Sequence, residues 1–129
     1  MQLPIEGKSS LGARGEDEAA RAYARRGARV LARNERNACG EIDLVVEEGE
    51  VLVAVEVKTR TLAPDGAPPM GRPAEAVSRA RLDRLARAFD LYAQARGLLG
   101  ARRRLDVAEV LVDRGGAIRE VRILDDVSA

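Results

Sequence analysis

The segment from residue 40 to residue 60 constrains the fold of this chain more than any other. It contains two runs rich in β-branched residues, Glu41 to Glu47 and Val51 to Thr59, with Glu48-Gly49 between them. This order predicts a β-hairpin with a tight turn. In the second run the valines at alternate positions share one face, and the other face begins with Leu52 and Ala54. Because both faces begin apolar, we expect the second strand to be central in a sheet covered by helices on each side.

The same hairpin carries charged residues that a buried strand would be expected to avoid. If Glu48 and Gly49 form the loop, Asp43 lies opposite Ala54 and Glu41 lies opposite Glu56. Asp43 is then diagonal to Glu56 on one face, where diagonal neighbours are about 7–8 Å apart, and Lys58 follows on the same face. A buried charge is costly unless a partner or a cation compensates it. We therefore interpret this patch as a site at which a cation sits among the acids, although a one-residue shift in register would scatter it.

Lys58 also stands out in the composition of the chain. Of its 22 basic residues, only Lys8 and Lys58 are lysines. A lysine kept inside a strand against this preference for arginine indicates a role that arginine cannot fill, since lysine is a compact charge whose pKa falls on burial. Chance retention is the alternative.

The composition excludes several kinds of catalytic site. Histidine is absent, which excludes Ser-His-Asp triads, histidine general bases and histidine zinc sites. The aromatic residues are Tyr23, Phe89 and Tyr92 alone, so stacking platforms for single strands are not expected. Any chemistry must therefore use carboxylates and lysine, with or without a hard metal.

The length of the chain predicts a single domain over residues 1–129. The net charge of +1 gives no general affinity for nucleic acid, so a binding surface must come from local clusters of charge. The single Cys39 forms no internal disulfide, no apolar run approaches a membrane span, and the first residues lack the pattern of a signal peptide. We expect a cytoplasmic protein.

The region before the hairpin predicts a helix from Gly12 to about Gly27. Its inward stripe is expected to contain Ala13, Glu16, Ala20, Tyr23, Ala24 and Gly27. Glu16 is unusual there, because an acid on this stripe would face the protein. It is either a functional acid or a first-turn glutamate that the helix dipole favours.

The remaining elements follow from spacing and turn residues. We expect a strand from Arg29 to Asn34, and a loop from Thr61 to Pro73 that serves as a flap or as a connector. A long helix is expected from about Pro73 to Arg96. Two strands, Leu105 to Val112 and Ile118 to Leu124, are expected around the turn at Gly115-Gly116.

Arginines gather at two further places. The long helix carries Arg79, Arg81, Arg84 and Arg87 off its apolar stripe, and Arg102-Arg103-Arg104 precedes the next strand. A solvated surface explains most of such residues, and contact with phosphate groups is the alternative.

Several blocks spread over nearly the whole chain carry a family resemblance. They are Gly15-Glu16 with Ala19-Ala20, Arg33-Asn34, Gly40-Glu41-Ile42-Asp43-Leu44, Val55-Glu56-Val57-Lys58-Thr59-Arg60 and Leu105-Asp106-Val107. The order of helix, three strands, helix and strand pair, with the acids on the middle hairpin, resembles the core of PD-(D/E)XK nucleases. Together the blocks resemble its YraN branch of uncharacterised bacterial proteins.

The resemblance implies an α/β fold with a restriction-endonuclease-like core, in which a mixed central β-sheet is flanked by helices in the order αβββαβ plus a final strand. It implies that Asp43 and Glu56 hold Mg²⁺ or Mn²⁺, with the Val57 carbonyl completing the shell. Lys58 would orient or activate the attacking water, and Glu16 would reach toward the metal from the helix. Hard oxygen ligands suit both cations.

The implied function is a metal-dependent endonuclease that binds structured DNA, branched DNA first, through its phosphate backbone. We expect phosphate contacts from Arg60, Arg81 and the triplet Arg102, Arg103 and Arg104, with Glu41 in a supporting role; Arg81 stands where family members tend to have lysine. A homodimer is expected, because two symmetric cuts need two sites. The alternatives are a nucleic-acid-binding module that has lost the reaction, and a structural domain whose acids form ion pairs with arginines.

Overall fold

Two helices and five strands make up the structure, a computed structural model that describes residues 10–67 and 77–127. In chain order the elements are α1 (Ser10–Arg25), β1 (Arg29–Asn37), β2 (Gly40–Glu48), β3 (Val51–Thr61), α2 (Arg79–Ala95), β4 (Arg102–Val112) and β5 (Ile118–Leu124). None of the helices in this part of the chain is long and apolar enough to cross a lipid bilayer.

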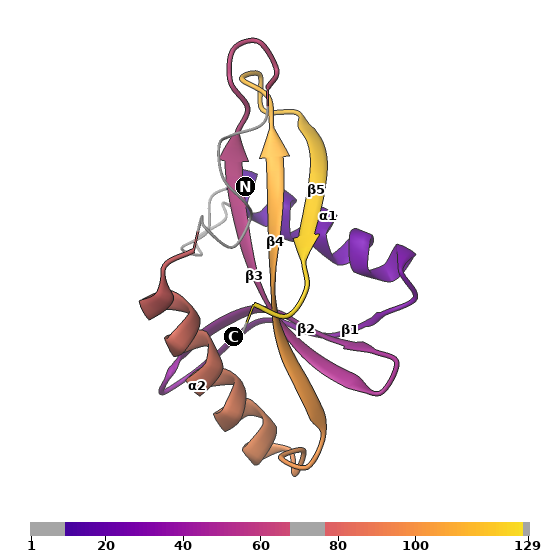
Figure 1. Cartoon of the computed structure of the whole chain (residues 1–129), viewed down its shortest axis with the longest axis vertical. Helices are drawn as coiled ribbons and strands as arrows, with labels where there is room; N and C mark the ends of the chain where they lie inside the picture. The colour runs from indigo at the N-terminus through magenta and orange to yellow at the C-terminus, as the bar shows by residue number, and fades with distance from the viewer. Residues whose placement is uncertain (1–9, 68–76, 128–129) are drawn as a thin grey trace, which may run out of the picture.

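The strands form one mixed sheet in the order β1-β2-β3-β4-β5. β3 lies at its centre, parallel to β4 and antiparallel to β2, and the two helices cover different faces (Figure 1). The prediction of an α/β fold with a mixed central sheet between helices is confirmed, and the arrangement is consistent with a restriction-endonuclease-like core.

The alternation along β3 divides the core into two halves. Leu52 and Ala54 point toward α2, where they join Leu85 and Phe89 in one apolar cluster. The valines at positions 53 and 55 join Tyr23 of α1 in the other. Both faces of β3 are therefore buried along its first half, as the apolar pattern predicts.

The hairpin register differs from the prediction by two residues. β2 and β3 pair Val45 with Ala54 and Glu48 with Val51, so the loop consists of Gly49 and Glu50 rather than Glu48 and Gly49. Gly49 has a φ of 62°, and glycine at the first loop position suits a hairpin turn that needs positive φ there. Because the shift is even, the paired residues 44–48 and 51–55 keep their predicted faces. Ile42 nevertheless lies in the apolar cluster of Val45 and not in that of Leu44, and the predicted pairing of Glu41 with Glu56 is wrong.

The inward face of α1 is rotated from the predicted stripe. Glu16 and Tyr23 are buried as expected, but Ala13 and Ala24 are exposed, and Gly15 and Ala19 are buried in their place. Alanines on adjacent faces leave the stripe ambiguous in the sequence, because an alanine is acceptable in the core and in water.

The long helix begins later than predicted. α2 begins at Arg79 after an N-cap at Ser78, whose side chain accepts a hydrogen bond from the Arg81 N–H. The predicted first turn, 73–76, lies outside the described residues. Residues 68–73 of the predicted loop also lie outside the described residues, so its role as flap or connector stays a prediction. In the described first part of this loop, the Gly66 N–H donates to the Ala63 carbonyl and closes a turn.

Gly15 allows α1 to approach β3 closely. A Cβ at this position would lie 2.8 Å from the Thr59 Oγ1 atom, which is closer than such atoms approach. The close approach places the next residue, Glu16, against the end of β3 that carries the charges. A side chain at position 15 would therefore push the helix away from the sheet.

We expect Gly15→Ala to lower the free energy of unfolding by about 1–2 kcal/mol, because overpacking outweighs the helix propensity that alanine gains. Denaturant unfolding of the single variant and of Gly15→Ala in a Thr59→Ala background measures this effect. In the second background the clash is removed, so alanine should be neutral or stabilising. Equal destabilisation in both backgrounds would contradict the proposed contact.

Candidate functional site

The charged residues of the hairpin lie where β2 separates from β3. Main-chain pairing of the two strands extends to Leu44 and Val55, after which β2 continues alongside β1 as far as Gly40. The Val57 N–H donates instead to the Asp43 carboxylate, at 2.8 Å. In Figure 1 the β1–β2 hairpin turns away from the long β3–β4 pair. A carboxylate thus replaces the backbone acceptor at the fork between the strands.

Three acids at this fork are buried. Glu16, Asp43 and Glu56 are 3%, 3% and 5% exposed. Glu56 faces α2, where the Arg81 Nε atom lies 3.0 Å from its Oε2 atom. Burial of this many carboxylates in one region is costly. Two of them have partners that offset this cost: Asp43 gains the Val57 N–H, and Glu56 gains the Arg81 guanidinium.

One cavity gathers the predicted residues from both helices and from β3. Its volume is about 460 Å³. It is lined by Gly12, Glu16, Glu56, Val57, Lys58, Thr59, Val77, Ser78 and Arg81. Glu16, Glu56 and Lys58 are thus brought together as the sequence predicted, and Asp43 lies beside Val57 on the neighbouring strand.

Lys58 lies in this cavity but is not buried. The prediction that it is a desolvated charge inside a strand is wrong, because its side chain is exposed. β2 has already left β3 at Val55, so this strand no longer covers β3 at position 58. Within residues 10–67 and 77–127 no carboxylate forms an ion pair with Lys58. Its ammonium group is available to a molecule that enters the cavity.

A second, smaller hollow of about 180 Å³ adjoins the cavity. It shares Glu56 and Arg81 with the first and adds Gly40, Glu41, Arg84 and Leu85. Glu41 faces its strand partner Arg36, with 3.3 Å between the charged groups. It therefore reaches the neighbourhood of Glu56 from the side, not from the opposite position that the sequence register assigned to it. The sequence assigned Arg84 to a solvated surface, with phosphate contact as the alternative, and its i,i+3 spacing from Arg81 places both on one side of the helix.

The predicted phosphate-binding arginines differ in position. Arg81 lines both cavities. Arg60 lies near the end of β3, where its guanidinium is 2.7 Å from the fully buried Glu109. Its phosphate contact stays a prediction, and the pairing with Glu109 gives its charge a role inside the protein.

The triplet Arg102, Arg103 and Arg104 lies away from the cavity. These residues pair with positions 51–53 of β3, three to five residues before Glu56, or about 10–16 Å along the strand. Arg103 lies 3.3 Å from Asp90 of α2. Arg104 contacts Glu48 and Asp106 at 2.6 and 3.0 Å. Contact with DNA by this triplet is untested, and two of its members hold acids of the same chain.

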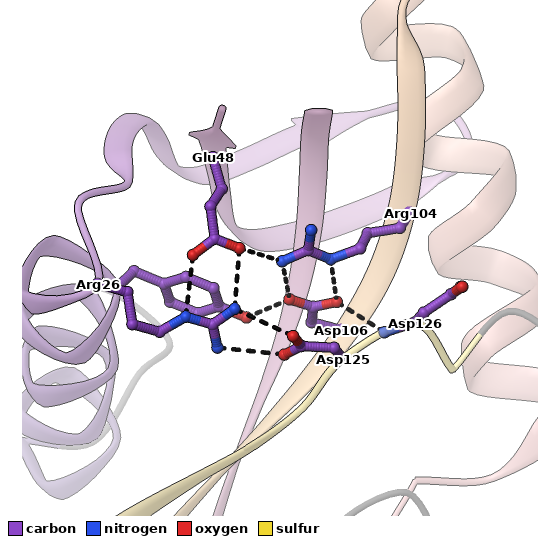
Figure 2. A network of polar contacts seen from close by, with 7 residues as sticks. Arg26, Glu48, Arg104, Asp106, Asp125 and Asp126 are labelled. Carbon is purple, nitrogen blue, oxygen red and sulfur yellow. Dashed lines mark hydrogen bonds and ion pairs between the residues drawn. The ribbon is translucent and has the colours of Figure 1, made fainter. Parts of the chain in front are cut away.

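Arg104 belongs to a polar network that the sequence did not predict (Figure 2). At its centre is Asp106, which is fully buried and accepts hydrogen bonds from Tyr23 at 2.7 Å, from Arg104 at 3.0 Å and from the Asp126 N–H at 2.9 Å. Arg26 joins Glu48 to Asp125. The network ties α1, the hairpin and the C-terminal segment together at the end of the sheet opposite the cavity.

Hydrogen bonds from Arg104 and Arg26 hold the pKa of Glu48 below its usual value of 4.5. A carboxyl group whose pKa is lowered by folding stabilises the folded state above its unfolded pKa, and this contribution is lost as the pH falls through the folded pKa. We therefore expect the free energy of unfolding to fall below about pH 4.5, and to fall less steeply in Glu48→Gln. Urea unfolding over a pH series measures this. Glu50→Gln, in the exposed hairpin turn, is the control and should follow the parent; a Glu48→Gln curve parallel to the parent curve would contradict the assignment.

The donor atoms at the fork are suitable for a hard cation, but they do not form a complete metal site as they stand. Asp43, Glu56 and the Val57 carbonyl offer oxygen atoms, which Mg²⁺ and Mn²⁺ prefer. Within residues 10–67 and 77–127, no three acidic, histidine or cysteine side chains are grouped closely enough to hold a metal ion. Glu56 is paired with Arg81 instead.

Comparison with known proteins shows that this chain is similar to the members of one family. Residues 15–110 match the family described as uncharacterised protein family UPF0102. Proteins named UPF0102 protein are similar over most of their length: one from Pelotomaculum thermopropionicum is 36% identical over 116 residues, which cover 90% of this chain and 92% of the relative. One from Symbiobacterium thermophilum is 42% identical over 109 residues, covering 84% and 88%. One from Beutenbergia cavernae is 40% identical over 115 residues, covering 89% and 93%.

Proposed function

This chain belongs to the UPF0102 family, and from that premise we propose that it is a divalent-metal-dependent endonuclease. In this proposal it is a YraN-type member of the PD-(D/E)XK superfamily. It binds structured DNA, branched DNA first, through the phosphate backbone.

One observation carries the proposal. A single cavity contains two buried acids from different elements, Glu16 and Glu56, together with the exposed ammonium group of Lys58, and Asp43 is buried on the adjacent strand. Acids alone would repel a phosphodiester, and a lysine alone would only attract it. Acids that bind a cation beside a free ammonium group suit the hydrolysis of a phosphodiester.

The residues that would hold the cation are Asp43 and Glu56, with the Val57 carbonyl. When bound, Mg²⁺ or Mn²⁺ would stabilise the negative charge that builds up on the phosphodiester. The proposal requires Glu56 to exchange the Arg81 guanidinium, now 3.0 Å away, for the cation.

The remaining side chains of the cavity would position the substrate. Lys58 would orient or activate the attacking water, since its ammonium group is exposed at the cavity. Arg81, about half exposed, would contact a phosphate group through its planar fork. Glu16 approaches from α1 as a further acid near the cation.

The second candidate function is a nucleic-acid-binding module without a reaction. The Glu56–Arg81 ion pair favours it, because this pair neutralises a carboxylate that a nuclease would need for its cation. Both candidates predict DNA binding, and only the first predicts cleavage.

Incubation with duplex, single-stranded and four-way-junction DNA, with and without Mn²⁺, separates the two functions. The nuclease proposal predicts cleavage that depends on Mn²⁺ and that stops when EDTA is added. Binding of the same DNA without metal-dependent cleavage would contradict the nuclease and support the binding module.

The proposal extends to assembly and location. A junction-cutting enzyme needs two sites, so we propose a homodimer, with Leu99 as one apolar contact because its side chain is 52% exposed after α2. The cytoplasm is the expected location of an enzyme that acts on chromosomal DNA.

A further inference from the structure

The second hollow beside the cavity contains a charge that the described residues do not neutralise. Its two acids are both paired, Glu56 with Arg81 at 3.0 Å and Glu41 with Arg36 at 3.3 Å. Arg84 is exposed, and no carboxylate in residues 10–67 and 77–127 forms an ion pair with it. The hollow therefore offers one guanidinium group to an incoming anion.

The backbone of β2 forms the opposite wall of this hollow. At Gly40, where φ is +152°, a Cβ would lie 3.9 Å from the Arg84 carbonyl and 3.9 Å from the Ala88 Cβ. β2 and α2 are thus in close contact here, and glycine leaves its backbone uncovered by a side chain. The hollow therefore has the arginines of α2 on one side and the backbone of β2 at Gly40 on the other.

Arg81 and Arg84 project from the same side of α2, one turn apart. Positions i and i+3 of a helix are about 4.5 Å apart along its axis. Arg81 reaches the first cavity and the second hollow, whereas Arg84 reaches only the second. The two guanidinium groups therefore form a short basic row that runs from the first cavity into the second hollow.

We propose that the second hollow binds the backbone phosphate next to the one that enters the first cavity, and that Arg84 is the residue that anchors it. The inference rests on the proposed function, in which a DNA phosphate enters the first cavity, and it names the residue that holds the neighbouring phosphate. A guanidinium fork can donate two parallel hydrogen bonds to one phosphate, which makes arginine suitable for this role.

The chain provides a matched control at Arg87. This residue is also an exposed arginine of α2 without an ion-pair partner in the described part of the chain, but it lines neither cavity. Arg84→Gln and Arg87→Gln therefore remove the same net charge from the same helix. A difference between them reports the position of the charge rather than its amount.

The experiment measures binding of a fluorescein-labelled four-way DNA junction in EDTA, where no cleavage takes place, over a range of salt concentrations. We expect Arg84→Gln to weaken binding roughly three- to tenfold and to reduce the slope of log affinity against log salt by about one. Arg87→Gln should lie close to the parent, and Arg84→Lys should be intermediate. Thermal melting checks that all variants are folded.

The outcomes distinguish this inference from the nuclease proposal. Equal losses in Arg84→Gln and Arg87→Gln, an unchanged salt slope in Arg84→Gln, or no DNA binding by the parent would overturn the phosphate site. Metal-dependent cleavage, measured separately, would still support the nuclease. A loss specific to Arg84 in a protein that never cleaves DNA would support the phosphate site and overturn the nuclease.

Discussion

Replacing Lys58 by methionine is expected to reduce Mn²⁺-dependent DNA cleavage by about 10²–10⁴-fold. The lysine lies at the cavity beside Glu16 and Glu56, so it is the residue placed to act on the attacking water. Its side chain is exposed, and no carboxylate of the described chain pairs with it. Its removal should therefore leave the free energy of unfolding within about 0.5 kcal/mol of the parent.

Lys58→Arg is the matched variant. Arginine keeps the charge but spreads it over a wide fork that stays protonated, so it should not restore cleavage. Initial rates on the preferred DNA, measured beside denaturant unfolding, provide the comparison. Full activity in Lys58→Met would contradict the role given to this side chain, and full activity in Lys58→Arg would show that only its charge matters.

Replacing Asp106 by alanine is expected to destabilise the protein by about 3–5 kcal/mol. Asp106 is fully buried and accepts from Tyr23, Arg104 and the Asp126 N–H, as Figure 2 shows for the arginine and the C-terminal segment. Without this carboxylate, the Tyr23 hydroxyl and the largely buried Arg104 guanidinium lose their acceptor. Buried donors left unpaired carry the full cost of their lost hydration.

Denaturant unfolding of Asp106→Ala, Tyr23→Phe and the double variant measures this effect. The hydroxyl donates to Asp106 at 2.7 Å, so the two single losses should not add, and the double variant should be more stable than their sum predicts. Asp90→Ala is the control, because its side chain is 66% exposed in its ion pair with Arg103; it should cost no more than about 1 kcal/mol. A loss of similar size in Asp106→Ala would contradict a central role for the network.

The sequence predicts the strands of the hairpin well because alternation and turn residues are local. Val51 to Thr59 lies within the central strand, Glu16 and Glu56 line one cavity as expected, and Asp43 accepts from the Val57 N–H on the neighbouring strand. The turn chemistry did not fix the register, since glycine can occupy either loop position. The difference of two residues placed Asp43 beside Val57 rather than opposite Ala54.

The features that the sequence missed depend on contacts between distant residues. Alternation assigns Lys58 to a face, but it does not reveal that β2 leaves β3 at Val55 and uncovers this end of β3. Asp106 was visible as an acid within an apolar strand, which is a signal of a buried partner. Its partner Tyr23 comes from α1, and no local pattern joins the two. Arg104 is two positions before Asp106 on the same strand, but it was interpreted as part of a phosphate-binding triplet.

The proposed nuclease depends most on a divalent cation at Asp43 and Glu56, and calorimetric titration of Mn²⁺ tests this directly. The parent is expected to bind Mn²⁺, and Asp43→Asn and Glu56→Gln are each expected to lose the binding while Lys58→Met retains it. Glu47→Gln is the control, because this acid lies on the same strand as Asp43 but pairs with Arg29 at the surface; it should bind like the parent. A parent that binds no Mn²⁺, or fork variants that bind it as tightly as the parent, would contradict the account.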